Sequence, residues 1–241
     1  SEETEAWDRI VNRYEKVCKK AHDLDVALLI DAEESWMQQA ADDLALEMMR
    51  KYNKEKAIVF NTFQMYRWDR LDYIKKLHAL ANAEGFKVGA KVVRGAYMEK
   101  ENERAQEKGY KTPICNNKKE TDQNFDAAIT YLMDHLDCFN VFAGTHNEQS
   151  CHKLIDAMES KNLKTNDPRV WFGQLFGMSD HITYNLTAAG YNAVKYVPYG
   201  PVKDVMPYLI RRAEENTSVA GQTSRELALL QKERKRRKLE D

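Results

Sequence analysis

The sequence predicts an α/β protein with a parallel, barrel-like sheet, and three observations lead to this fold class. Short apolar runs alternate six times with longer amphipathic runs along the 241 residues. The short runs are continuously apolar, as in parallel strands that are covered by helices. Polar residues follow the short runs, and the carboxyl ends of parallel strands meet at one edge of a sheet or one mouth of a barrel.

Each predicted strand is three to five residues long and mostly apolar, and a predicted helix follows it. The predicted strands cover residues 26–30, 57–60, 89–93, 140–143, 170–172 and 193–197. The predicted helices cover about residues 35–51, 69–84, 122–136, 147–161, 179–189 and 201–216. The second of these is typical, with leucine and alanine at helical spacing. Residues 100–117 are polar and show little pattern.

A (β/α)8 barrel is favoured over a doubly wound open sheet. In an open sheet the ligand-binding residues gather at one switch point, whereas here polar residues end every unit. No G-x-G-x-x-G phosphate loop is present either. A complete barrel has eight strands, and this chain supplies about six of them. The residues that end the units are Asp31, Asn61, Arg94, Thr145–Asn147, Gln174 and Tyr199.

Two of these strand ends suggest a bound cofactor. Thr145, His146 and Asn147 place three hydrogen-bonding side chains together, which suits a polar cofactor group. Gly95, just after a strand, allows the backbone to approach a flat ligand closely, although a simple turn also explains it.

A second candidate feature is the arginine-containing helix near the C-terminus. Tyr208, Arg211, Arg212 and Glu215 have the i, i+3, i+4, i+7 spacing of one helix face. Two arginines can hold a carboxylate with paired hydrogen bonds, and the glutamate can fix one of them. The alternative is a solvated face with surface ion pairs.

Composition excludes several classes of function. Lys plus Arg number 37 and Asp plus Glu 38, so nothing indicates a nucleic-acid partner. No His, Cys or carboxylate set has metal-ligand spacing, so we expect no metal.

We expect a single domain over 1–241 with a basic helical tail over about 222–241. That tail suits an acidic membrane surface, an import signal or a solvated helix.

Six sequence blocks, in order, resemble the proline dehydrogenase family. They span about Asp31 to Asn216, and their wording is closest to the eukaryotic mitochondrial branch of that family. The blocks are residues 30–33 (IDAE), 91–97 (KVVRGAY), 145–147 (THN), 172–178 (FGQLFGM), 196–200 (YVPYG) and 208–216 (YLIRRAEEN).

The resemblance implies a distorted (β/α)8 barrel whose last helix, about residues 201–216, lies over the barrel mouth. It implies oxidation of L-proline to Δ1-pyrroline-5-carboxylate, the first step of proline catabolism. Hydride would pass from proline C5 to N5 of FAD, and a membrane quinone would accept the electrons. The implied location is the matrix side of the mitochondrial inner membrane, in peripheral contact with it.

The resemblance also assigns residues to the site. Arg211 and Arg212 would clamp the substrate carboxylate, with Glu215 holding Arg212. The other implied substrate contacts are Tyr208, Tyr196, Asp31 and Val92. The implied cofactor contacts are Asn61, Lys91, Val93, Gly95, Ala96, Tyr97, Met98, Thr145, His146, Asn147 and Gln174. No residue stands out as a unique acid or base.

The chain also departs from the family pattern. The family's first two barrel strands, one of which carries a substrate-binding lysine, have no counterpart before Asp31, so the chain resembles the C-terminal three-quarters of a barrel domain. Two other functions stay open. One is hydroxyproline dehydrogenase, against which Tyr196 argues because such members carry a small residue there. The other is a non-catalytic proline-binding or scaffold protein.

The arginine clamp makes a direct prediction. Arg211→Met weakens binding of proline and of carboxylate analogues by about 2–5 kcal/mol, because one partner of a buried charge pair is lost. Calorimetric titration with such an analogue measures the change, and unchanged affinity refutes the assignment.

Overall fold

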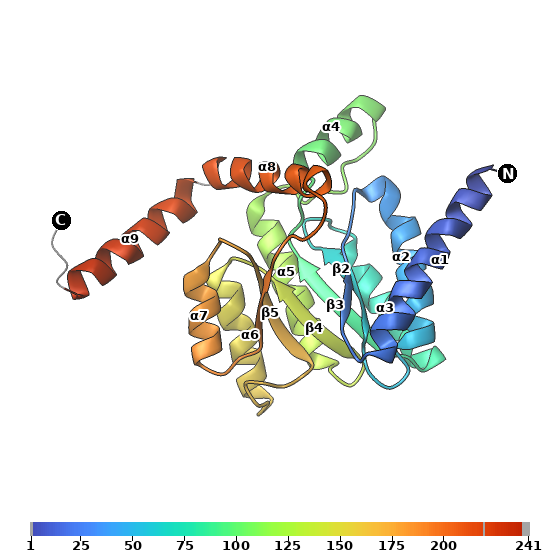
Figure 1. Cartoon of the computed structure of the whole chain (residues 1–241), viewed down its shortest axis with the longest axis horizontal. Coiled ribbons are helices and arrows are strands. Elements are labelled where there is room, and N and C mark those ends of the chain that lie inside the picture. Colours follow the sequence, from blue (N-terminus) through green and yellow to red (C-terminus); the bar gives the residue numbers. More distant parts are fainter. Residues whose placement is uncertain (1, 219, 238–241) are drawn as a thin grey trace.

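The computed structural model contains a parallel sheet in which every strand lies next to its neighbours in the sequence (Figure 1). The structure describes residues 2–218 and 220–237, without the side chains of Arg211 and of residues 214–226. The sheet curls into part of a barrel with helices on its outer side, which confirms the predicted fold class. The strands are β1 Leu28–Ile30, β2 Val59–Gln64, β3 Val88–Val93, β4 Phe139–Gly144, β5 Val170–Leu175 and β6 Ala193–Tyr196.

The helices that follow the strands agree with those that the sequence predicted, with one additional helix between β3 and β4. The stretch over residues 100–117 that lacked a pattern contains α4. The helices are α1 Glu2–Asp23, α2 Ser35–Tyr52, α3 Arg70–Glu84, α4 Met98–Lys108, α5 Lys118–Asp134, α6 Glu148–Ser160, α7 Asp180–Ala188, α8 Val202–Ser218 and α9 Ala220–Arg236. None of the described helices is both long and apolar enough to span a bilayer.

Strand pleating divides the side chains into two sets, because successive residues of a strand point to opposite faces. In β3, Val88, Ala90 and Val92 are fully buried in the core beneath the helices. Lys91 and Val93, between and after them, line a cavity on the inner face. The other strands repeat this alternation, so the hydrophobic core lies between the sheet and the helices, and the residues between the core positions line the cavity inside the curl.

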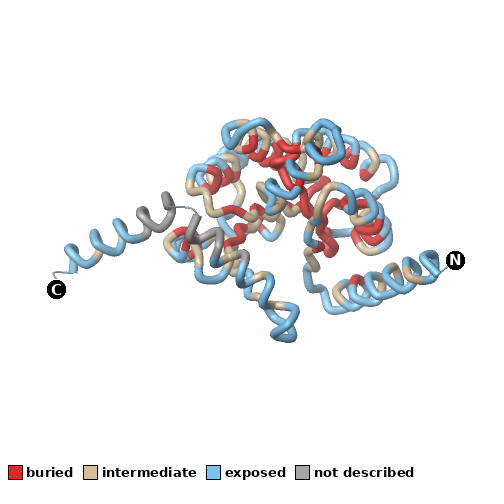
Figure 2. Tube along the Cα trace, turned by 90° about the horizontal axis from the view of Figure 1, so that it is seen from above, coloured by how far each residue is buried: buried red, intermediate tan, exposed pale blue. Residues whose placement is uncertain are grey.

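The two terminal helices differ from the rest in burial. Figure 2 shows that α1 and the described part of α9 are mostly exposed, whereas buried residues gather around the sheet. α8 crosses above the carboxyl ends of the strands, and α9 extends away from the body (Figure 1). Within the described residues, β1 and β6 each pair with one neighbour only, so the curl is open between them.

Asn53, at the C-terminal end of α2, joins three elements. It is fully buried, and its amide nitrogen donates to the carbonyls of Val59 (2.8 Å) and Lys87 (3.0 Å). Its amide oxygen accepts from the backbone N–H groups of Ile58 (2.9 Å) and Val59 (2.8 Å). One side chain therefore satisfies four backbone groups where β2 and β3 begin.

Asn53→Ala lowers the free energy of unfolding by about 3 kcal/mol, since the buried backbone groups lose their partners without gaining water. Chemical denaturation measures the change. Asn185→Ala is the matched control, because Asn185 is exposed and donates one bond, to His181 O at 2.7 Å. A loss at Asn53 no greater than at Asn185 contradicts this account.

Candidate functional site

A cavity of about 1550 Å³ fills the inner face of the curled sheet. All six strands contribute to its wall, and α8 contributes from above. Its lining is mixed, with aromatic rings and glycines along the strands and charged or amide side chains near both ends of the strands. The expected site residues that line it are Asp31, Lys91, Val93, Gly95, Ala96, Tyr97, Thr145, His146, Asn147, Gln174, Tyr196, Tyr208 and Arg212.

An ion pair joins Asp31 and Lys91 across the strand between them. Lys91 extends from β3 over the inner face of β2 and donates to Asp31 at the end of β1. The lysine side chain is 15% exposed, and the aspartate is 56% exposed. Partial burial strengthens such a pair relative to one in water, so the two charges are fixed at the cavity mouth.

α8 closes one side of the mouth with an aromatic pair and a guanidinium group. The rings of Tyr196 and Tyr208 lie 5.4 Å apart between centroids. The guanidinium carbon of Arg212 lies 5.1 Å from the centroid of the Tyr208 ring. Burial, followed by the nearby Asp31, raises the pKa of Tyr196. The side chains of Arg211 and Glu215 lie outside the described residues, so the rest of the expected clamp is not seen.

The turn Thr145–Asn147, which follows β4, is held from the β5 side. The N–H of Thr145 donates to Gly173 O (3.0 Å), and its carbonyl accepts from the Gln174 side chain (3.1 Å). Asn147 caps α6, because its side chain accepts from the N–H of Ser150 (3.1 Å). The three polar side chains that were predicted to act together therefore lie at one edge of the cavity.

His146 lies within this turn and is partly buried. Its Nδ1 lies 3.0 Å from Ser179 Oγ. Burial, then the charges of Lys195 and Arg212, lowers the pKa of His146 to about 4. The imidazole is therefore neutral at pH 7 and offers the cavity a neutral hydrogen-bonding group.

The segment after β3 bends over the cavity. Gly95 has φ +130°, and a Cβ there would lie 2.6 Å from the Tyr66 ring, so only glycine fits. The N–H of Ala96 donates to Gln64 Oε1 (3.3 Å). The hydroxyl of Tyr97 donates to Glu33 Oε2 (2.9 Å), which ties the end of β3 to the end of β1.

The structure does not bring three expected residues into the cavity. Val92 is fully buried in the core beneath the helices. Asn61 also faces the helices, where its amide donates to Asp42 (2.7 Å). Met98 begins α4 and is 54% exposed, outside the cavity lining. Val92 and Asn61 are displaced by strand pleating, since each is one position away from an inward-facing residue.

Several cavity residues were not expected from the sequence. Thr62 and Gln64 of β2 face inward. Lys195 of β6 also borders the cavity, although it alternates with the inward-facing Val194 and Tyr196, and its ammonium group donates to Met178 O (2.5 Å) and pairs with Asp180 (2.7 Å). The signal that could have identified Thr62 and Gln64 is their alternation with Asn61 and Phe63 along one strand.

Within the described residues, no three His, Cys, Asp or Glu side chains gather in a metal-binding arrangement.

The low pKa of His146 makes stability depend on pH. In the unfolded chain a histidine has a pKa of about 6.5, so on acidification the unfolded state takes up this proton first. The stability contributed by neutral His146 is therefore complete above about pH 6.5 and falls as the pH approaches 4. His146→Gln makes the free energy of unfolding decline less between pH 7 and pH 4.5, as measured by urea denaturation. Equal declines in the two proteins contradict the assignment.

Comparison with known proteins agrees with this geometry. A family model described as proline dehydrogenase matches residues 3–225. The human protein named proline dehydrogenase 1, mitochondrial, is 42% identical over 232 residues, covering 95% of this chain and 39% of that protein. A Xenopus laevis protein named hydroxyproline dehydrogenase is 35% identical over 231 residues, covering 94% of this chain and 50% of that protein.

The fold also has a close counterpart among solved structures. The crystal structure of proline utilization A from Bdellovibrio bacteriovorus, inactivated by N-propargylglycine, superposes with a TM-score of 0.82 at 24% identity. The superposition covers 91% of this chain and 23% of that one. This chain thus spans only part of the length of the relatives that it matches. The family model, which covers most of the chain, together with the human relative, shows that the chain belongs to the proline dehydrogenase family.

Proposed function

We propose that this protein oxidises L-proline to Δ1-pyrroline-5-carboxylate with FAD as cofactor. The observation that carries the proposal is a large cavity whose mouth combines aromatic rings with a guanidinium group beneath α8. Proline combines an apolar ring with a carboxylate, so its recognition requires both kinds of group at one place.

The substrate-binding residues are assigned by this chemistry. Arg212, with Arg211 beside it in the sequence, binds the carboxylate, because guanidinium groups hold carboxylates with paired hydrogen bonds. Tyr196 and Tyr208 pack against the ring. Asp31 holds Lys91 in place at the mouth. Glu215 is proposed to orient Arg212.

The size of the cavity supports the binding of a flavin dinucleotide. Sites for single small molecules measure about 300–1,000 Å³, and the cavity of about 1550 Å³ exceeds that range. Gly144 and Gly173 are paired neighbours on β4 and β5, and neighbouring side chains fill the space beside them: a Cβ on Gly144 would lie 2.9 Å from Val93 Cγ1. A Cβ on Gly173 would lie 2.4 Å from the Phe142 ring. The Phe142 ring and the Val93 side chain therefore make this part of the wall apolar, which suits a flat ring system.

The proposed cofactor-binding residues surround this wall. They are Lys91, Val93, Gly95, Ala96, Tyr97, Thr145, His146, Asn147 and Gln174. When bound, FAD would supply the acceptor for hydride from proline C5. The protein contributes positioning and electrostatics, because the redox chemistry belongs to the cofactor. The carboxylate clamp orients C5, and α8 limits the access of water to the mouth.

We further propose a membrane quinone as electron acceptor and a mitochondrial location, the latter supported by the name of the human relative. The outer face of α8 supports peripheral contact with the inner membrane, since Val202, Met206 and Ile210 are exposed there. α9 adds Arg234, Lys235 and Arg236 in its last turn, which suit an acidic lipid surface.

Hydroxyproline oxidation is the second candidate, favoured by the likeness to the Xenopus protein. The Tyr196 ring, packed on Tyr208, favours proline because it takes the space that an added hydroxyl would need.

The purified protein, supplied with FAD, is expected to show the visible absorbance of a bound flavin. With an artificial electron acceptor, its kcat/KM for proline is expected to exceed that for trans-4-hydroxyproline. Tyr196→Ser is expected to lower the ratio of kcat/KM for proline to kcat/KM for trans-4-hydroxyproline about tenfold. A pocket discriminates by about this factor between substrates that differ by one small group. A preference of the unaltered protein for hydroxyproline contradicts the substrate assignment. Lack of flavin binding supports a non-catalytic role instead.

A further inference from the structure

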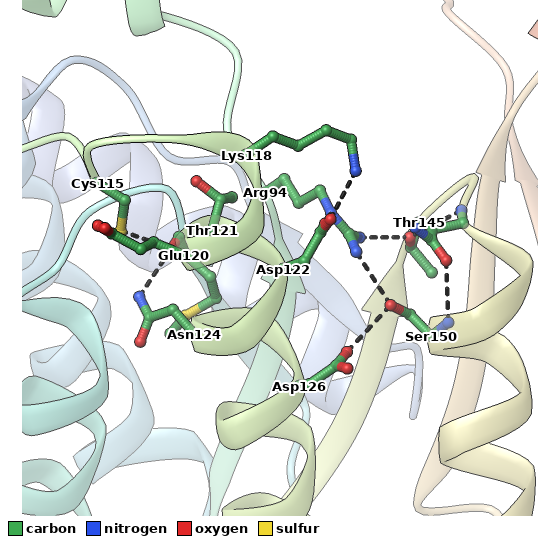
Figure 3. Close-up of polar contacts among 12 residues, drawn as sticks. Arg94, Cys115, Lys118, Glu120, Thr121, Asp122, Asn124, Asp126, Thr145 and Ser150 are labelled. Atoms are coloured by element: carbon green, nitrogen blue, oxygen red, sulfur yellow. Dashed lines mark hydrogen bonds and ion pairs between the residues drawn. The ribbon is translucent and has the colours of Figure 1, made fainter. Parts of the chain in front are cut away.

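The side chain of Arg94 joins four elements at the carboxyl end of the sheet (Figure 3). Arg94 follows β3, and its Nε donates to Asp122 Oδ1 of α5 at 2.7 Å. One terminal nitrogen donates to Thr145 Oγ1 at 2.9 Å, after β4. The other donates to Ser150 Oγ of α6 at 3.0 Å. A planar guanidinium group can direct hydrogen bonds to three partners in this way, whereas an ammonium group lacks the fork geometry.

The partners of Arg94 are themselves held in place. The guanidinium carbon lies 4.5 Å from the centroid of the Phe125 ring. Lys118 pairs with Asp122 at 2.6 Å, and Ser150 Oγ donates to Asp126 at 3.1 Å. The Arg94 side chain is 22% exposed. A group fixed on this many sides has little rotational freedom and can transmit a fixed geometry to whatever it binds.

Arg94 reaches both ends of the turn Thr145–Asn147. It binds Thr145 directly, and Thr145 Oγ1 also accepts from the N–H of Asn147 (3.1 Å). It binds the hydroxyl of Ser150, whose N–H donates to the Asn147 side chain (3.1 Å). Gln174 and Ser179 hold the same turn from the side of β5 and α7. The turn that presents His146 to the cavity is therefore clamped between two sets of partners.

We infer that Arg94 is a positioning residue for the cofactor: it holds the turn Thr145–Asn147 in the geometry that receives the flavin. This inference rests on the proposed function, because it assumes that the cavity binds FAD. Asp122 and Asp126 balance the positive charge locally. Arg94 therefore acts mainly through Thr145 and Ser150, although its side chain also reaches the cavity wall.

The first test compares Arg94→Met with a matched control, Arg67→Met. Arg67 is also a largely buried arginine bonded to a carboxylate, at 2.7 and 3.0 Å from Asp69, but it does not line the cavity. Both changes lower the melting temperature of the flavin-free protein. Fluorescence titration is expected to show at least a tenfold rise in the Kd for FAD for Arg94→Met and less than a twofold rise for Arg67→Met.

Arg94→Lys keeps the positive charge, and it replaces Arg94→Met in this test if the methionine variant does not fold. We expect its Kd for FAD to rise severalfold and the visible circular dichroism of the saturated flavin to change, because the turn is no longer fixed. A Kd and a spectrum equal to those of the unaltered protein overturn the positioning role. If the unaltered protein binds no FAD, the proposed function fails, and this inference fails with it.

A double-mutant cycle with Ser150→Ala separates positioning from direct contact. If Arg94 acts through Ser150, the rise in Kd of the double variant is smaller than the product of the two single rises. Ser150 is buried on α6 and does not line the cavity, so it reports on the network alone. A double variant equal to that product indicates that Arg94 contacts the cofactor independently and overturns the inference.

Discussion

The fixed parallel register of β2, β3 and β4 is the constraint on which the candidate site depends. Thr62 lies opposite Lys91, and Lys91 lies opposite Phe142. Because the side-chain period of a strand is two residues, this register places all three on the inner face and their neighbours in the core. A shift by one residue would bring Val92 into the cavity and move Lys91 beneath the helices, where its charge would have no water and no Asp31.

The same constraint explains why the candidate site residues lie at the mouth. At the carboxyl ends of the strands the loops begin, and charged side chains there reach both partners and solvent. Lys91 forms an ion pair with Asp31, and Lys195 forms one with Asp180. The positive charge of each lysine is therefore balanced by a carboxylate beside the cavity. Deeper in the curl the Phe142 ring lies where Gly173 leaves space for it. The result is a cavity with an apolar middle and a charged mouth, which α8 covers, and with further charged residues such as Asp25, Lys56 and Arg169 at its opposite end.

Much of this arrangement was predictable from the sequence, and the failures have physical causes. Short, mostly apolar runs identified all six strands, because one face of the sheet packs in the core beneath the helices and much of the other is apolar cavity wall. The sequence placed the end of β2 near Asn61, but that strand continues to Gln64, so the outward-facing Asn61 was selected and the inward-facing Gln64 was missed.

α4 could not be recognised from apolar periodicity because a carboxylate anchors it. Its buried residues are Ala105 and Glu101, and Glu101 accepts from the N–H (2.5 Å) and the hydroxyl (2.6 Å) of Ser35. The roles of the arginine helix were accessible only through the family resemblance, since spacing alone also fits a solvated face. The Arg94 network joins residues from four elements, and no local sequence pattern predicts that these residues are in contact.

Thiol labelling of two adjacent positions tests most directly whether the pleat of β3 defines a flavin-binding cavity. Val93→Cys and Val92→Cys are treated with a small thiol reagent, with and without FAD, and the modified peptide is identified by mass spectrometry to separate it from Cys115. The register predicts that Cys at 93 reacts and that FAD protects it, whereas Cys at 92 stays unreactive in the folded protein. Labelling at 92 that FAD suppresses, with no reaction at 93, would contradict the account.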